Sequence, residues 1–298
     1  MRILITGLIV VSLAACNSGN KSEDQAFVEA LDEAGLESQI VSEEVKDILY
    51  RIPSPLEISV MLKQADNKYD PSLLNATDHA SRYSTNYQKA LNLGIYGTDL
   101  GYTNVYERSQ DGIRYMTAVT TLARELNIGQ FFEAETMGRL VSNSQNMDSL
   151  LLITTQNFNR INHYLLSQNR GHLTVLLLTG GWIEALHITC KVAEQFPDNK
   201  QLQETIGGQK IILDNLLQLL TYFKDNDKSI PGLLTDLAPL KEAFDKVSII
   251  TVYQPSTYEV VDGVMVVRDN SASTIEISPA DIEKIRTSTE RIRNKIIS

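Results

Sequence analysis

The chain has 298 residues, of which 43% are hydrophobic and 21% charged, and its net charge at pH 7 is -10. This composition excludes a largely disordered chain, which would be poorer in apolar residues. The acidic balance argues against a nucleic-acid partner, because nucleic-acid binders carry a basic surface. The only long, uncharged apolar run lies at the extreme N-terminus, which excludes a polytopic membrane protein.

The N-terminus has the pattern of a secretion signal. A single positive charge, Arg2, precedes an uncharged run of mostly Ile, Leu and Val from Ile3 to Leu13. This run has the length of a signal-peptide core and is too short for a spanning helix of about 20 residues. We therefore expect residues 1–15 to be a signal peptide.

The signal ends in Leu13, Ala14, Ala15 and Cys16. This sequence resembles the lipobox of bacterial lipoproteins. The resemblance implies cleavage after Ala15 and a diacylglyceryl group on Cys16, whose acyl chains would anchor the protein to a membrane. The alternative is an ordinary secretory signal that is followed by a chance cysteine.

Residues 16–25 are small and polar, and we expect them to form a flexible lipidated tether. Asn17 differs from the aspartate of the inner-membrane retention signal in enteric bacteria, so we expect a cell-envelope protein of the outer membrane. The run Lys21–Asp24 loosely resembles a surface-export signal of Bacteroidetes lipoproteins, and an ordinary charged tether is the alternative. The periplasmic and the surface face of that membrane both stay open.

The pattern of residues 26–298 predicts a mainly α fold, a multi-helix bundle with a small C-terminal β-hairpin. Helix starts are marked by Ser-Pro or Asp-Pro pairs at Ser54, Asp70 and Ser278. An Asp-Gly pair between two β-branched runs predicts a hairpin near 257–268, and residues 274–277 can add a third strand. The body is one helical domain, or two in close contact. Helices are expected near 24–35, 42–51, 55–66, 83–107, 110–126, 130–142, 146–168, 173–196, 200–224, 232–247 and 279–296.

The expected helix 83–107 carries small and aromatic residues at steps of four and three. This spacing places on one face Tyr83, Tyr87, Ala90, Gly94, Gly97 and Gly101. Three glycines inside a helix weaken it by about 1 kcal/mol each relative to alanine, so something should offset them. One interpretation is a close helix–helix crossing, and the other is a ligand that lies against the glycines between Tyr83 and Tyr87. Asp99 is expected to be solvated or paired with Arg108 or Arg114.

The expected helix 173–196 is strongly apolar but carries Glu184, His187 and Lys191 on one face. We interpret this face as a solvated or partner-facing stripe. Half of a carboxylate-bridged metal site is the alternative, but no second Glu-x-x-His exists in the chain, so no metal is expected. Cys190 lies in the same apolar segment and is expected to be a buried, inert thiol.

Three functional hypotheses follow. The first is a non-catalytic envelope lipoprotein that binds a partner protein or organises an assembly. The second is a binder of a small or lipidic ligand between helices, and the third is an enzyme with dispersed residues around Glu184, His187 and His163. No cofactor is expected. The stretches 87–106 and 179–187 also resemble helical envelope lipoproteins of Bacteroidetes, a resemblance that implies a location and no activity.

Overall fold

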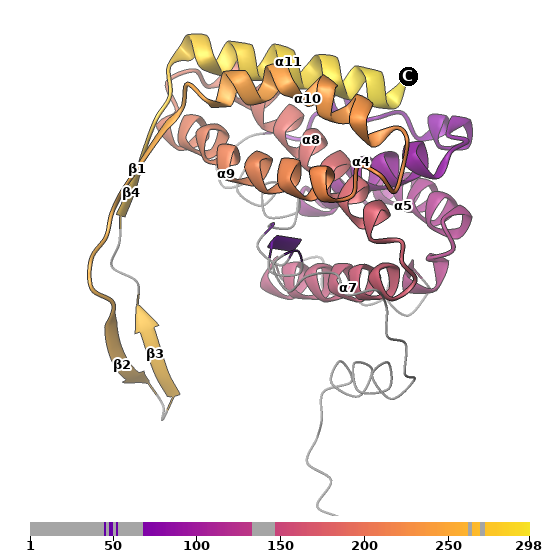
Figure 1. Ribbon diagram of the computed structural model, residues 1–298, viewed down its shortest axis with the longest axis horizontal. Helices are drawn as coiled ribbons and strands as arrows, with labels where there is room; N and C mark the ends of the chain where they lie inside the picture. The colour runs from indigo at the N-terminus through magenta and orange to yellow at the C-terminus, as the bar shows by residue number, and fades with distance from the viewer. Residues whose placement is uncertain are drawn as a thin grey trace, which may run out of the picture. The chain divides into compact units, whose positions relative to one another are not determined.

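A computed structural model describes most of the chain (Figure 1). All described residues belong to one compact unit, Val41–Ser298. They are Val45, Ile48, Leu49, Ile52, 68–132, 147–261, 264–268 and 272–298. The predicted signal peptide, the tether and the expected helices near 24–35 and 55–66 lie outside these residues.

The described part of the chain is mainly α-helical, as predicted. Two short 3-10 helices, η1 (Pro71–Leu73) and η2 (Thr77–Arg82), precede the bundle. A third, η3 (Gly129–Phe132), lies at the start of the helix expected near 130–142. The α-helices are α4 (Asn86–Val105), α5 (Ser109–Glu125), α7 (Met147–Ser167), α8 (Gly171–Gln195), α9 (Lys200–Tyr222), α10 (Ile230–Phe244) and α11 (Pro279–Ile297).

Local sequence signals explain where several helices begin. Thr85 caps α4 through a reciprocal pair of hydrogen bonds with Gln88, in which each residue's side chain accepts the other's backbone N–H. Ser278 accepts the Asp281 N–H at 3.2 Å, with Pro279 at the first position of α11, as the sequence predicts. Each cap satisfies a backbone donor that has no partner inside the helix.

Three helices end through the same backbone geometry. Glu107, Asn127 and Asn169 have φ angles of 57°, 56° and 57°, in the left-handed region. The N–H of the next residue then bonds a carbonyl five residues back, as from Arg108 to Thr103 at 2.9 Å. These turns reverse the chain after α4, α5 and α7.

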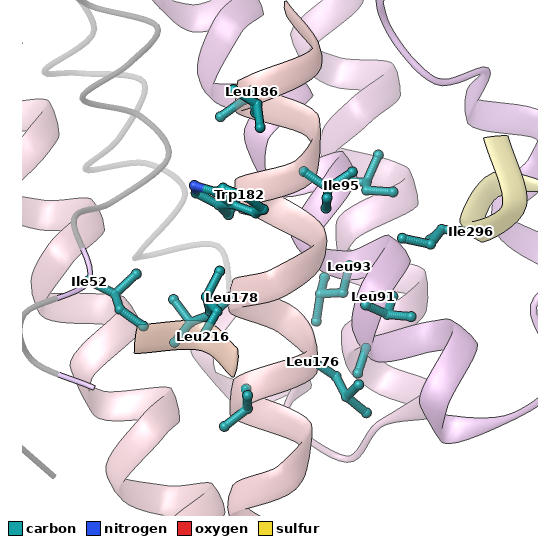
Figure 2. Packing of buried hydrophobic residues seen from close by; sticks show 14 of the residues in the cluster. Ile52, Leu91, Leu93, Ile95, Leu176, Leu178, Trp182, Leu186, Leu216 and Ile296 are labelled. Atoms are coloured by element: carbon teal, nitrogen blue, oxygen red, sulfur yellow. The ribbon is translucent and has the colours of Figure 1, made fainter. Parts of the chain in front are cut away.

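Helix α8 is the centre of the bundle. Figure 2 shows its side chains meeting those of α4 on one side and Leu216 of α9 on the other. By length and composition α8 is apolar enough to cross a membrane, but 94% of its most apolar window is buried inside the protein. It is therefore the core helix of the unit, and its apolar composition follows from contacts on every side.

Helices α4 and α8 cross at glycines. A Cβ atom on Gly94 would overlap the carbonyl oxygen of Leu177 and lie 2.6 Å from the Gly181 nitrogen. A Cβ atom on Gly180 would likewise overlap the carbonyl oxygen of Leu91. Thr98 joins the two backbones, since its hydroxyl donates to the carbonyls of Gly94 and Gly181, both at 3.1 Å. The close-crossing interpretation is confirmed at Gly94.

The prediction that six residues share one packed face of this helix is wrong for Gly97 and Tyr83. Gly97 is exposed, with no atom within 4 Å of an added Cβ, because the crossing involves a narrower strip of α4 than the sequence pattern suggested. Tyr83 precedes the helix, which begins at Asn86, so it does not lie on this face. Gly101 is buried inside α4.

Four strands follow α10. The predicted hairpin is confirmed as β2 (Thr257–Val261) paired antiparallel with β3 (Val264–Arg268). A second antiparallel pair joins β1 (Ser248–Val252), which was not predicted as a separate strand, to β4 (Ala272–Glu276), which overlaps the possible third strand at 274–277. Figure 1 shows that β1 follows α10 and that β4 leads into α11.

Alanine substitutions at Gly94 and Gly97, which lie about one turn apart on α4, should have opposite effects on the free energy of unfolding. We expect Gly94→Ala to lower the free energy of unfolding by about 2 to 3 kcal/mol, since its methyl group meets backbone that cannot rotate away. Gly97→Ala should raise it by about 0.5 to 1 kcal/mol through helix propensity. Urea denaturation measures both, and equal effects of the two variants would contradict the crossing.

Candidate functional site

The face of α8 that was expected to meet solvent is buried. Glu184 is 0% exposed and His187 is 7% exposed, so the prediction of a solvated stripe is wrong for both. Only Lys191 reaches solvent in part. The reason is that α11 packs along this face and supplies partners for its polar side chains.

Arg293 of α11 holds Glu184 through two hydrogen bonds. Its Nε donates to one carboxylate oxygen at 2.5 Å and its Nη2 donates to the other at 2.7 Å. Nη2 also donates to the Leu73 carbonyl of η1 at 3.1 Å. This two-point geometry suits a planar guanidinium and a carboxylate, and in a buried setting it fixes the angle between the two helices.

A second carboxyl, Asp99 of α4, lies beside this pair. Asp99 is 0% exposed and accepts the Asn75 backbone N–H at 3.1 Å, so it is neither solvated nor paired with Arg108 or Arg114. Burial, and then the charge of Glu184, raise the pKa of Asp99 well above its ordinary value. The raised pKa favours the neutral form of Asp99, and this form reduces the negative charge that Arg293 faces.

Asn75 connects this cluster to a layer of tyrosines. Its side-chain amide donates to the Tyr83 hydroxyl at 3.2 Å, and its backbone carbonyl accepts from the Tyr115 hydroxyl at 3.0 Å. Tyr96 packs between the two, with ring centroids 6.4 Å from Tyr83 and 6.3 Å from Tyr115. Tyr83 was predicted to face a ligand, and the structure places it in this internal network.

His187 lies one turn beyond Glu184 among positive charges. Burial lowers its pKa to about 3, and the nearby cations Arg293, Lys191 and Arg286 act in the same direction. The imidazole is therefore neutral at physiological pH. A metal ion would meet the same repulsion, and in the described part of the chain no three His, Cys, Asp or Glu side chains lie in an arrangement that could hold one.

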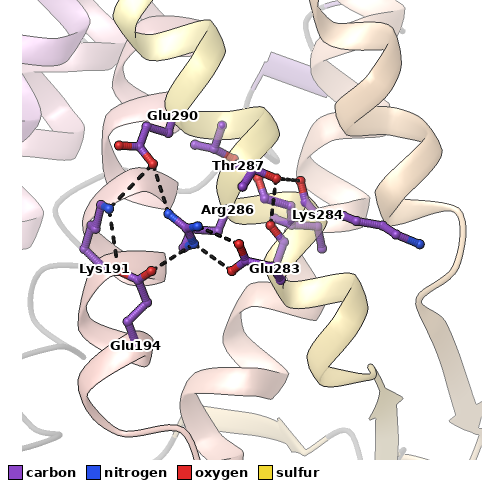
Figure 3. A network of polar contacts seen from close by, with 9 residues as sticks. Lys191, Glu194, Glu283, Lys284, Arg286, Thr287 and Glu290 are labelled. Atoms are coloured by element: carbon purple, nitrogen blue, oxygen red, sulfur yellow. Dashed lines mark hydrogen bonds and ion pairs between the residues drawn. The ribbon is translucent and has the colours of Figure 1, made fainter.

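An ion-pair network at the surface continues the contact between α8 and α11 (Figure 3). Arg286 pairs with Glu194 at 2.9 Å, with Glu283 at 2.6 Å and with Glu290 at 3.0 Å. Lys191 lies 3.5 Å from both Glu194 and Glu290. Single exposed pairs contribute little, but a shared arginine orders several partners at once.

The remaining predicted site residues do not converge. Tyr87 is half-buried, and its pKa is raised to about 12 by burial and then by the charges of Asp236 and Asp227. It points to a different environment from Tyr83, which contacts Asn75. His163 lies half-buried on α7. The glycine face at Gly94 is filled by the backbone of α8, so a ligand cannot lie there.

The cluster of Glu184, Asp99 and Arg293 is thus better suited to holding helices than to chemistry. Its two carboxyls have no exposed surface through which a substrate could reach them. Every strong contact that it makes joins elements of the chain itself. Asn75 and Arg293 were not predicted to be site residues, and Asp99 was predicted in the wrong environment. Asn75 lies between η1 and η2, and no local sequence signal marks its contacts with the helices.

The described surface carries exposed apolar side chains in and beside the strands. Ile250 and Val252 of β1 are 48% and 55% exposed, while Tyr253 and Tyr258 are 84% and 69% exposed. Ile250, Val252 and Tyr253 are near neighbours in the chain, and exposed apolar groups that form one patch commonly mark a contact with another molecule. This segment was not predicted to be a site.

Comparisons with protein-family models, with curated proteins and with solved structures find no match.

The ion pair of Glu184 with Arg293 can be tested by a double-mutant cycle. Arg293→Met should lower the free energy of unfolding by about 3 to 5 kcal/mol, because Glu184 is left buried without its partner. Glu184→Leu should have a similar effect. The double variant should lose much less than the sum of the two, and a strictly additive result in chemical denaturation would show that the residues do not interact.

The burial of His187 predicts a loss of stability in acid. Its pKa is about 3 when folded and 6.5 ordinarily, so the unfolded state binds more protons between these values. The free energy of unfolding therefore keeps its full value above pH 6.5 and decreases as the pH drops. At pH 4.5 the decrease that is due to His187 should be about 3 kcal/mol. His187→Gln should flatten this slope in chemical denaturation at several pH values, and an unchanged slope would contradict the role of His187.

Proposed function

We propose that this protein is a non-catalytic, lipid-anchored component of the bacterial cell envelope that binds a partner protein. The observation that carries the proposal is the sequence Leu13-Ala14-Ala15-Cys16 behind an uncharged apolar run. The lipid would be attached to Cys16, and the body that begins beyond residue 25 would be the binding part. We assign the anchor to the outer membrane.

The charge of the chain supports a role for the lipid. With a net charge of -10, the protein is not attracted to the anionic surface of a membrane. Stable attachment then needs two or more acyl chains, since a single chain binds a bilayer only marginally. Acyl groups on Cys16 provide that number.

Binding rather than catalysis is supported by how the polar groups are used. Glu184 is held by Arg293, and Asp99 accepts a hydrogen bond from the Asn75 backbone. The alternatives of an enzyme near Glu184 and of a ligand at the glycine face draw no support from the described residues. The exposed apolar side chains of Ile250, Val252, Tyr253 and Tyr258 instead favour a protein contact.

Replacement of the anchoring cysteine tests the first part of the proposal. We expect Cys16→Ser to abolish incorporation of labelled palmitate and to release the protein from the membrane fraction, or to leave it as an unprocessed precursor. Cys190→Ser is the matched control, because Cys190 is 1% exposed and should take no lipid. Wild-type protein that incorporates no palmitate would overturn the assignment.

A further inference from the structure

Among the residues that the structure describes, strand β1 is paired along one edge only. Ser248–Val252 pairs with β4 on one side only, and the sheet that they form has two strands. Among the described residues no third strand joins it. The backbone N–H and C=O groups on the outer edge of β1 are therefore available to another extended segment.

The two faces of this ribbon differ. Ile249 and its cross-strand partner Ile275 are partly buried against the core, and an added Cβ at Gly207 of α9 would lie 2.5 Å from the Ile275 side chain. Ile250 and Val252 point to the opposite side and are about half exposed. One face of the β1–β4 pair therefore packs on the helices, and the other face exposes Ile250 and Val252 beside the outer edge of β1.

The absence of charge on β1 makes a second copy of the chain an acceptable partner for this edge. Of the four strands that the structure describes, β1 alone has no charged residue, whereas the others contain Glu259, Arg268 and Glu276. Monomeric proteins usually protect an edge with a charge or a proline, and β1 has neither. In a molecule with a net charge of -10, two copies meet without like-charge opposition along this strand.

We propose that β1 binds β1 of a second copy of this chain, in an antiparallel pairing centred on Ile250. Such a contact is symmetric, so the same edge serves both copies and no further complementary surface is required. Ile250 would face Ile250 of the second copy, and Ser248 would face Val252 of the second copy. The result is a four-stranded sheet in the order β4-β1-β1-β4, with the apolar side chains of both copies on one face.

This inference deepens the proposed function, because it names the partner as a second copy, and it rests on the proposed function for its setting at a membrane. A five-residue edge buries little surface and would associate weakly in dilute solution. A lipid anchor would raise the local concentration of the copies and so favour their contact.

Cysteine crosslinking of the full-length chain tests the pairing and its register. Facing residues of an antiparallel pair have Cα atoms about 4.5 to 5.5 Å apart, within the range that a disulfide spans. The native Cys190 does not interfere, since it is buried and burial raises the pKa of its thiol to about 12. Ile250→Cys should give a disulfide-linked dimer as its main species under mild oxidation.

Two further variants report the register. Ser248→Cys and Val252→Cys should each crosslink poorly alone and should crosslink efficiently when expressed together. Ile113→Cys is the control for a more exposed thiol on another element, because Ile113 on α5 is 68% exposed and Ile250 is 48% exposed. Thermal melting of each variant confirms that it folds.

The outcomes divide clearly. A dimer of Ile250→Cys with the complementary Ser248 and Val252 result supports the proposal. No dimer, equal dimer formation by Ile113→Cys, or an adduct with a different protein overturns it. Palmitate labelling of the same samples shows whether anchoring has failed separately, since an unlabelled protein that still crosslinks refutes the anchor and not the pairing.

Discussion

The arrangement of the bundle depends on the close crossing of α4 and α8. Backbone meets backbone there because Gly94 and Gly180 carry no side chains, and an added Cβ at either position would overlap a carbonyl oxygen. At this separation Thr98 can bond to both helices, and Asp99 of α4 comes within reach of Glu184 of α8. A wider crossing would leave the two carboxyls apart and would change the place at which Arg293 can bind.

The polar cluster that results is stable only if its charges balance. Two buried carboxylates beside one arginine would leave an uncompensated negative charge, which is costly in a medium of low dielectric. The raised pKa of Asp99 reduces this imbalance, since it favours the neutral form of Asp99 beside the carboxylate of Glu184 that pairs with the guanidinium. The contacts of Arg293 with α8 and η1 then specify how α11 packs, a role for which apolar side chains would be less selective.

Much of the fold could be predicted from the sequence because its signals are local. Ser278 with Pro279 marks a helix start through geometry that involves a few neighbouring residues, and the Asp262-Gly263 hairpin is similar. The environment of Glu184 and His187 could not be predicted, because three polar residues on a helix face have the same spacing whether they meet water or another helix. Gly97 and Gly94 differ for the same reason, since only the path of α8 decides which glycine is covered. Strand β1 was not recognised because its paired residues in β4 lie 20 to 28 residues away in sequence.

Strand pairing allows an acidic protein to associate with itself for a physical reason. Coulomb repulsion between copies is screened over about 8 Å at physiological ionic strength, while main-chain hydrogen bonds act only at contact. A strand without charges therefore adds attraction at short range and no repulsion of its own. Association in three dimensions also requires a large loss of translational freedom, and molecules that share a membrane plane have already lost part of it. The weak edge of β1 and the lipid that we propose on Cys16 would thus be complementary, because such an anchor would supply the concentration that a short strand pair needs.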